Sequence, residues 1–170
     1  MIKKILFATD LSDNSRHAFK YAANLANHYQ ATLVILHVME GLSDSFKNRI
    51  TNFLGQEAWE HIRDTKETGV RKILIGKKSE RHVLKRALSQ ISEKLQANGQ
   101  LDPFEADEII VGEGQNVAEE IRRTATEKNC DTIVMSGRGE SLLDTTSLGR
   151  ITRDVLKRTR LPVMVVPPIK

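Results

Sequence analysis

Two polar segments of the sequence carry residue types that could bind a small ligand. Asp10 follows a short apolar run, and the segment 136–139 (Ser-Gly-Arg-Gly) follows a later one. A carboxylate after a strand can accept hydrogen bonds from a ribose hydroxyl or an adenine amino group. Glycines let backbone amides approach phosphate oxygens, and a helix N-terminus that follows them attracts anions. These residue types favour a nucleotide site, although loop glycines that only form turns are the alternative at this point.

The sequence contains little that points to a metal or to a covalent catalyst. Its five histidines are scattered, without an HExxH pattern or a close His/Cys group. It has no GxSxG motif, no Walker A motif and no GxGxxG after the first apolar run. We interpret His37 as a hydrogen-bonded structural residue and the lone Cys130 as a small buried one. We therefore expect no metal site, no catalytic residue and no enzyme, with weak hydrolysis of a bound nucleotide left as an alternative.

The apolar runs alternate with helical patterns. Five runs predict strands, at residues 4–9, 31–38, 108–111, 132–135 and 163–166. Ser12 or Asp13 is positioned to cap a helix between the first two strands. The segment 112–114 (Gly-Glu-Gly) predicts a turn, and Asn116 predicts a second helix cap. Because helices separate the strands, we predict an α/β fold with a doubly wound, five-stranded parallel sheet.

The region 41–104 is longer than one crossover needs. It contains two amphipathic stretches, marked by the apolar residues Phe46, Ile50, Phe53, Leu54, Ala58 and Ile62 and by Leu84, Leu88, Ile91 and Leu95. The segment 73–75 (Ile-Leu-Ile) lies between them and could add a short strand. We interpret 41–104 as a helical excursion within a single domain of residues 1–170, packed either on the sheet or on a partner.

Composition narrows the class of protein. The 26 basic and 22 acidic residues give a net charge of +4, and only 5% of the residues are aromatic. Nucleic-acid binders combine a basic face with stacking aromatics, so we do not expect a nucleic-acid partner. No apolar run approaches the roughly 20 residues that cross a bilayer, and the four-residue run near the N-terminus is too short for a signal peptide. With a single cysteine, the sequence indicates a protein of the reducing cytoplasm that does not enter a membrane.

Several segments, in order along the chain, resemble the universal stress protein family. They are the first strand with Asp10-Leu11-Ser12, the second strand ending in Leu36-His37-Val38, the Val111-Gly112-Glu113 turn, and the segments 131–135 and 161–166. The resemblance implies an adenine nucleotide alpha hydrolase-like sheet in the strand order 3-2-1-4-5, with the enlarged helical segment between strands 2 and 3. It also implies a stress-response protein that forms a homodimer through its C-terminal strand, residues 162–166.

Many family members that bind ATP or AMP contain a motif of glycine, two residues, glycine, nine residues and then glycine followed by serine or threonine. The spacing is retained here in Ser136, Gly139 and Gly149, with Arg150 after the last glycine. Ser136 replaces the first glycine of the motif. Arg150 replaces the hydroxyl residue but adds a cation that can pair with phosphate.

The resemblance implies a nucleotide site at the carboxyl ends of strands 1 and 4. Asp10 and Val38 match the positions that contact the nucleoside, and Ala8 stands where many members have proline. The residues expected at the site are Ala8, Thr9, Asp10, Val38, Ser136, Gly137, Arg138, Gly139, Gly149, Arg150 and Ile151. The ligand would be ATP or AMP, and whether Mg²⁺ accompanies it is left open. Because the phosphate motif is altered, the alternative is a nucleotide-free dimeric interaction protein of the same family, with 41–104 as its partner surface.

Overall fold

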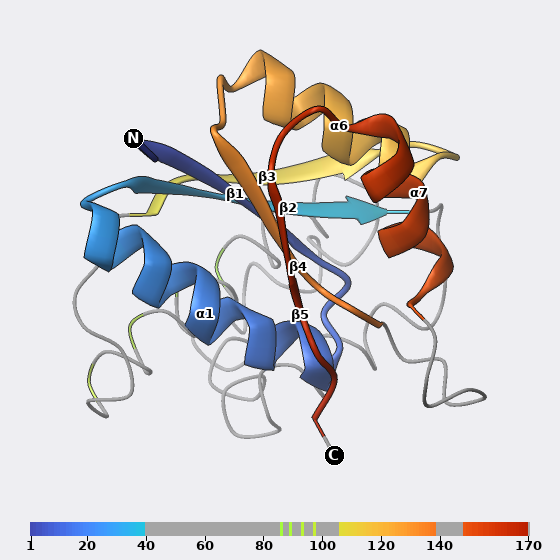
Figure 1. Ribbon diagram of the computed structural model, residues 1–170. Helices are drawn as coiled ribbons and strands as arrows, with labels where there is room; N and C mark the ends of the chain where they lie inside the picture. Colours follow the sequence, from blue (N-terminus) through green and yellow to red (C-terminus); the bar gives the residue numbers. More distant parts are fainter. Residues whose placement is uncertain are drawn as a thin grey trace, which may run out of the picture.

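The computed structural model describes residues 1–39, 86, 89, 93, 97, 106–138 and 148–169. The strands are β1 (Lys4–Thr9), β2 (Thr32–Met39), β3 (Ala106–Glu113), β4 (Thr132–Ser136) and β5 (Val163–Val166). The helices are α1 (Asp13–Tyr29), α6 (Val117–Glu127) and α7 (Arg150–Arg158). Every strand pair is parallel and the order is β3-β2-β1-β4-β5 (Figure 1). The α/β class, the five strands and the order 3-2-1-4-5 are confirmed.

The predicted helical excursion over 41–104, with its possible strand at 73–75, lies outside the described residues except at four positions. Those four, Arg86, Ser89, Glu93 and Ala97, are helical. The single domain of 1–170 and the role of the excursion therefore remain predictions.

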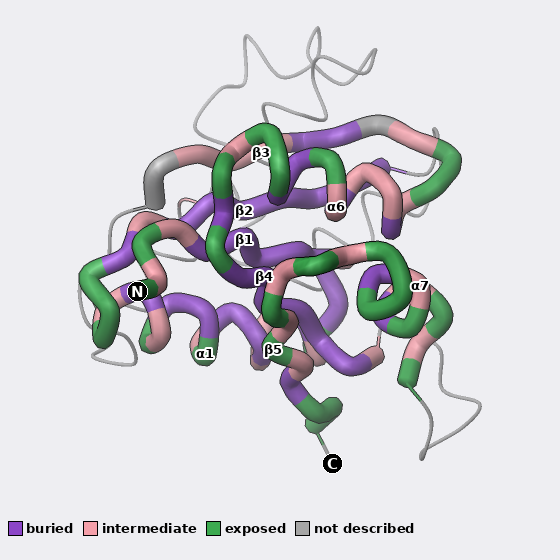
Figure 2. Tube along the Cα trace, turned by 45° about the horizontal axis from the view of Figure 1, so that its top comes forward, coloured by how far each residue is buried: buried purple, intermediate pink, exposed green. Residues whose placement is uncertain are grey.

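Helices cover both faces of the sheet, α1 on one side and α6 with α7 on the other (Figure 1). The alternation of β1 explains this arrangement, because successive side chains of a strand point to opposite faces. Phe7 packs with Phe19 of α1 at 5.4 Å between ring centroids, and Leu6 belongs to the same buried cluster as Ile121 of α6 and Val155 of α7. All five are buried, and each contributes roughly 1.5–3 kcal/mol relative to an exposed side chain. Figure 2 shows the central strands buried between the two helical layers.

Two of the helices begin at the predicted caps. The Ser12 hydroxyl accepts a hydrogen bond from the Ser15 amide at 3.1 Å, and the Asn116 side chain accepts one from the Glu119 amide at 3.1 Å. Each cap supplies a partner for one of the amides that the first turn of a helix leaves unpaired. The third helix differs, because α7 follows Gly149 and has no side-chain cap.

The turn predicted at residues 112–114 was wrong in its first residues, because they still belong to a strand. β3 continues through Gly112, which pairs with Val38 of β2, and ends at Glu113. A Cβ atom at Gly112 would lie 3.1 Å from Cγ and from Oε1 of Glu120. The glycine therefore makes room for the helix that packs on the strand, a role that its sequence context does not separate from a turn.

Candidate functional site

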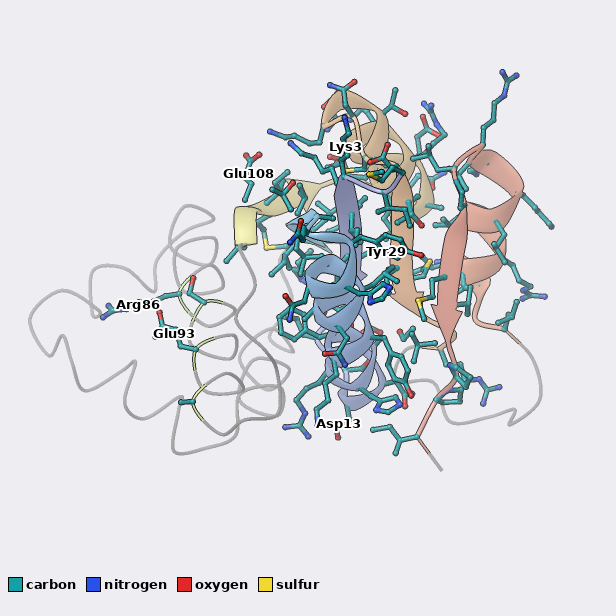
Figure 3. All side chains as sticks on the ribbon, turned by 60° about the vertical axis from the view of Figure 1, so that its left-hand side comes forward. Lys3, Asp13, Tyr29, Arg86, Glu93 and Glu108 are labelled. Atoms are coloured by element: carbon teal, nitrogen blue, oxygen red, sulfur yellow. The ribbon has the colours of Figure 1, made fainter. Side chains whose placement is uncertain are left out.

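The two polar segments singled out in the sequence follow neighbouring strands. β1 and β4 pair in parallel with Ala8 beside Met135, so Asp10 and Gly137 come next at the same edge of the sheet. Figure 3 shows the direction of β1, with Lys3 at its amino end and Asp13 beyond its carboxyl end. Ligands of open parallel sheets bind outside this carboxyl edge, where the strand order reverses. In the order β3-β2-β1-β4-β5, the reversal lies between β1 and β4.

The Asp10 carboxylate is held by the residue that caps α1. Its Oδ1 atom accepts hydrogen bonds from the Ser12 amide at 3.0 Å and from the Ser12 hydroxyl at 2.6 Å. The intervening Leu11 has φ 66°, in the left-handed region, and this bends the chain sharply between strand and helix. The turn thus fixes the position of a half-buried carboxylate, and a carboxylate oxygen is a hydrogen-bond acceptor.

A buried polar network lies beneath this turn, on the α1 side of the sheet. The Thr9 hydroxyl oxygen accepts hydrogen bonds from the Leu11 amide at 3.1 Å and from the Ser15 hydroxyl at 2.7 Å. Nδ1 of His37 lies 2.8 Å from the carbonyl oxygen of Thr9. These contacts confirm His37 as a hydrogen-bonded structural residue. The Thr9 hydroxyl therefore makes its hydrogen bonds on the α1 side of the sheet. The predicted site residues Ala8 of β1 and Val38 of β2 face the other side.

Ala8 and Val38 lie on the opposite face of the sheet, toward α6 and α7. Both are buried in the apolar cluster that includes Met135 of β4, and the half-buried Ile151 of α7 packs against that cluster. Three predicted site residues from three elements therefore share one apolar cluster.

The first turn of α7 is bound to the end of β4. The Gly149 amide donates a hydrogen bond to the Gly137 carbonyl at 2.9 Å, and the Gly137 amide donates one to the Val166 carbonyl at 2.7 Å. The buried Thr152 hydroxyl lies 3.1 Å from the Ser136 carbonyl oxygen and 3.4 Å from that of Gly137. Sequence reasoning missed Thr152. Its signal is a polar residue at a position that the helical period directs toward the sheet.

Gly137 at this turn allows a close approach to β5, whereas Gly149 leaves room for a Cβ atom. A Cβ atom at Gly137 would lie 3.3 Å from Cγ1 of Val165 and 3.3 Å from the Val166 carbonyl oxygen, and one at Gly149 would lie 3.4 Å from the Gly137 carbonyl oxygen. The α7 N-terminus that follows has no side-chain cap from its N-cap residue, Gly149. Such an end carries partial positive charge and suits an anion.

The remaining predicted residues are placed as follows. The Ser136 side chain is buried at the end of β4, and Arg138 is half-buried after it. The Arg150 side chain is exposed at the start of α7, 4.0 Å from the Asp154 carboxylate. Gly139 lies outside the described residues, so its part in the motif remains a prediction.

No three histidine, cysteine, aspartate or glutamate side chains come together as metal ligands in the part of the chain that the structure describes. Within that same part, no helix is both long and apolar enough to cross a membrane.

Comparison with known proteins gives a family match along nearly the whole chain. The model of the "Universal stress protein family" matches residues 1–167. Universal stress protein YxiE of Bacillus subtilis is 30% identical over 169 residues, which are 98% of this chain and 99% of that protein. Universal stress protein MJ0577 of Methanocaldococcus jannaschii is 26% identical over 167 residues, or 98% of this chain and 95% of that protein.

Two solved structures with the same fold contain adenine nucleotides. The universal stress protein from Archaeoglobus fulgidus in complex with dAMP aligns with a TM-score of 0.58 and 19% identity, over 98% of this chain and 99% of that one. A universal stress protein in complex with cAMP aligns with a TM-score of 0.54 and 19% identity, over 98% of this chain and 97% of that one.

Proposed function

This chain belongs to the universal stress protein family, and we propose that it is a regulatory member that binds ATP or AMP where β1 and β4 end. One observation carries the proposal. The Asp10 carboxylate and the uncapped N-terminus of α7 follow two strands that are neighbours in the sheet. A hydrogen-bond acceptor for a nucleoside and an anion-binding helix end therefore lie at the same edge of the sheet, where the strands end. The dAMP and cAMP complexes of proteins with this fold support the choice of an adenine nucleotide.

In this proposal, the nucleoside lies against β1 and β2. Oδ1 of Asp10 is held by Ser12, so the carboxylate faces a ligand in a fixed orientation. As an acceptor, it suits a ribose hydroxyl or the adenine amino group, both of which donate. Ala8 and Val38 add apolar surface on the α6 and α7 side.

The phosphate lies at the start of α7. Gly149 brings the helix end close to the β4 turn, and Arg150 supplies a cation in place of the family's small hydroxyl residue. A guanidinium pairs well with phosphate, so the altered motif keeps an anion site of a different kind. We leave the requirement for Mg²⁺ as a question for titrations with and without the metal.

The test is isothermal titration with AMP, ATP and adenosine. Asp10→Asn keeps an acceptor for Ser12 but presents an NH₂ group in place of a carboxylate oxygen. We expect it to weaken binding of all three ligands at least tenfold with little change in the midpoint of thermal unfolding. Asp13→Asn is the matched control, because Asp13 lies in the same turn and pairs with Arg16 on the surface. Absence of binding to the wild type at millimolar nucleotide would reject the proposal.

A nucleotide-free dimer is the second candidate, and one observation favours it. β5 is an edge strand with Met164 36% exposed, and an unpaired edge invites another chain. Sedimentation of the wild type and of Met164→Lys, without nucleotide, tests whether this strand joins two copies. If the wild type is monomeric, this candidate fails.

We further propose that the protein acts as a cytoplasmic sensor and not as an enzyme. The single cysteine, Cys130, is buried and suits a reducing compartment. Release of phosphate from ATP, followed over hours, measures the hydrolase alternative directly. Release of about one phosphate per protein molecule per minute would contradict a role as a sensor.

A further inference from the structure

The net charge of the chain is concentrated in one short segment. Residues 150–160 contain five of the 26 basic residues and one of the 22 acidic residues, a net charge of +4. This equals the net charge of the whole chain, so the remaining 21 basic and 21 acidic residues cancel. The segment consists of α7 and the two residues that follow it.

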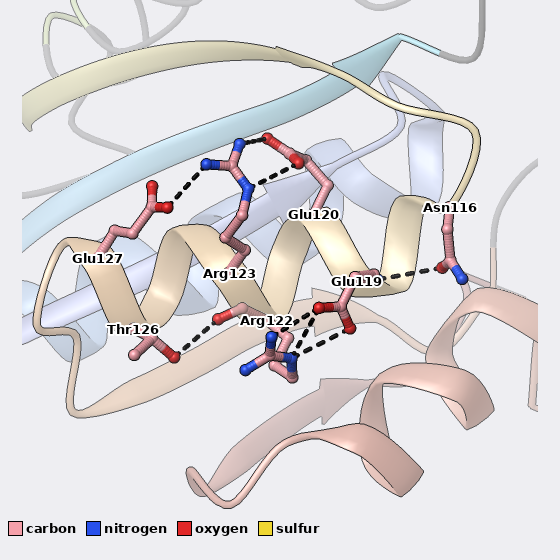
Figure 4. Close-up of polar contacts among 7 residues, drawn as sticks. All are labelled: Asn116, Glu119, Glu120, Arg122, Arg123, Thr126 and Glu127. Carbon is pink, nitrogen blue, oxygen red and sulfur yellow. Dashed lines mark hydrogen bonds and ion pairs between the residues drawn. The ribbon is translucent and has the colours of Figure 1, made fainter.

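Four basic residues elsewhere in the described structure, on α1, on α6 and directly after α6, have acidic partners. Arg16 pairs with Asp13 at 2.9 Å, and Lys128 pairs with Glu108 at 2.5 Å. On α6, Arg122 and Arg123 pair with Glu119, Glu120 and Glu127 at 2.5–2.7 Å (Figure 4). Among the described residues, no such pair involves Arg153, Lys157 or Arg160, and all three are exposed. We call these three residues the basic surface.

Helix stability accounts for only part of this arrangement, because Lys157 lies in the last turn of α7, where a cation is favourable, but Arg153 lies near the start. Negative charge stabilises the start of a helix, and α6 follows that rule with Glu119 and Glu120 in its first turn. α7 has no acidic residue in its first turn and carries Arg150 at its first position, with Arg153 one turn later. These cations oppose the helix dipole, so a requirement other than helix stability accounts for them better.

We propose that the basic surface binds an acidic segment of another protein. Arg153 and Lys157 are four residues apart, so they lie side by side on the helix, and Val155 between them faces the core. A partner helix with carboxylates at the same spacing matches this pair. A second copy whose two-fold axis passes through this surface would place like charges opposite each other. Residues 148–169 contain no aromatic residue, so a stacking platform for single-stranded nucleic acid is absent from this segment. The surface leaves Arg150 to the proposed nucleotide site and does not depend on it.

The probe is a labelled 20-residue peptide of alanine with glutamate at every fourth position, followed by fluorescence anisotropy at low salt. We expect Arg153→Glu/Lys157→Glu to weaken binding at least tenfold, and added salt to weaken wild-type binding, because exposed charges are screened. The matched control is Arg16→Glu/Lys20→Glu, which has the same spacing and the same change in net charge on α1. Circular dichroism checks that both variants fold.

Three outcomes would overturn the proposal. One is an equal loss of affinity in the control, which would mean that only net charge matters. Another is no binding of the peptide by the wild type at low salt. The third is tighter binding of a 20-nucleotide oligothymidylate than of the peptide, which would identify a nucleic-acid surface instead.

Discussion

α6 and α7 lie side by side on the same face of the sheet, yet their ends and charges differ (Figure 1). α6 has the Asn116 cap, two glutamates in its first turn and arginines paired to glutamates along its length (Figure 4). α7 has a glycine before its first turn, no side-chain cap and two exposed basic residues, Arg153 and Lys157, without an ion pair in the described part of the chain.

The difference indicates a division of roles within one layer. At its start α6 satisfies the local rules of helix stability, while the start of α7, next to the predicted site, has neither a side-chain cap nor an acidic residue. Departures from local rules are expected where a protein binds ligands. The attachment of α7 to the sheet through Thr152 compensates for part of this deficit.

The largest effect is expected from Thr152→Val, which keeps the shape of the side chain but removes its hydroxyl. The Ser136 and Gly137 carbonyls lose a buried donor, so the free energy of unfolding should fall by about 1–3 kcal/mol. Because α7 then sits less firmly on the β4 end, AMP affinity should fall as well. Denaturant unfolding measures the stability and calorimetric titration of the same sample measures the AMP affinity. An unchanged AMP affinity would mean that α7 does not contribute to the site.

Asn116→Ala is the corresponding change at α6. Loss of the cap should lower the free energy of unfolding by about 1 kcal/mol. AMP affinity should not change, because α6 has no predicted site residue. A weaker AMP affinity in this variant would show that stability alone controls binding, and the contrast between the helices would disappear.

Gly149→Ser should act in opposite directions on stability and binding. The backbone at Gly149 has φ −57° and ψ 153°, which serine adopts easily, and a Cβ atom there has only ordinary van der Waals contacts. A serine cap should stabilise α7 by up to about 1 kcal/mol. Its hydroxyl would compete with phosphate for the first amides, so AMP binding should weaken more than adenosine binding. Equal effects on the two ligands would argue against a phosphate at this helix end.

The smallest effect is expected from Glu119→Gln, and this effect should be present near neutral pH and disappear in acid. The hydrogen bond from the Arg122 guanidinium lowers the pKa of the Glu119 carboxyl. A lowered folded-state pKa gives stability that is present above the unfolded value, about 4.3, and is lost as pH falls through the folded value. The variant should therefore lose less stability than the wild type below pH 4.3. Thermal unfolding between pH 3 and 7 checks this, and parallel curves would contradict the pairing.

Sequence alone predicted the features that depend on local pattern. The five apolar runs, the Ser12 and Asn116 caps and the structural role of His37 follow from residue type and spacing, and the structure confirms them. The strand order came from a family resemblance, because local patterns do not specify which strands pair.

What sequence reasoning missed depends on contacts between distant segments. Gly112 looked like a turn residue, but its reason is the Glu120 side chain of the helix that packs on it. Thr152 looked like an ordinary helix residue, and only the fold brings its hydroxyl to the Ser136 carbonyl. Both contacts join segments that are distant in the sequence, and residue spacing alone does not identify the partner atoms.

The Ser12 hydroxyl touches two parts of the molecule at once. It donates to Asp10 and accepts from the Ser15 amide, so one oxygen atom connects the carboxylate to the first turn of α1. A ligand that hydrogen-bonds to Asp10 would therefore alter the hydrogen bonding at the start of that helix, without any movement of the sheet. We expect adenosine to change the rate of hydrogen exchange at the Ser15 amide. The start of α1 would then report whether the site is occupied.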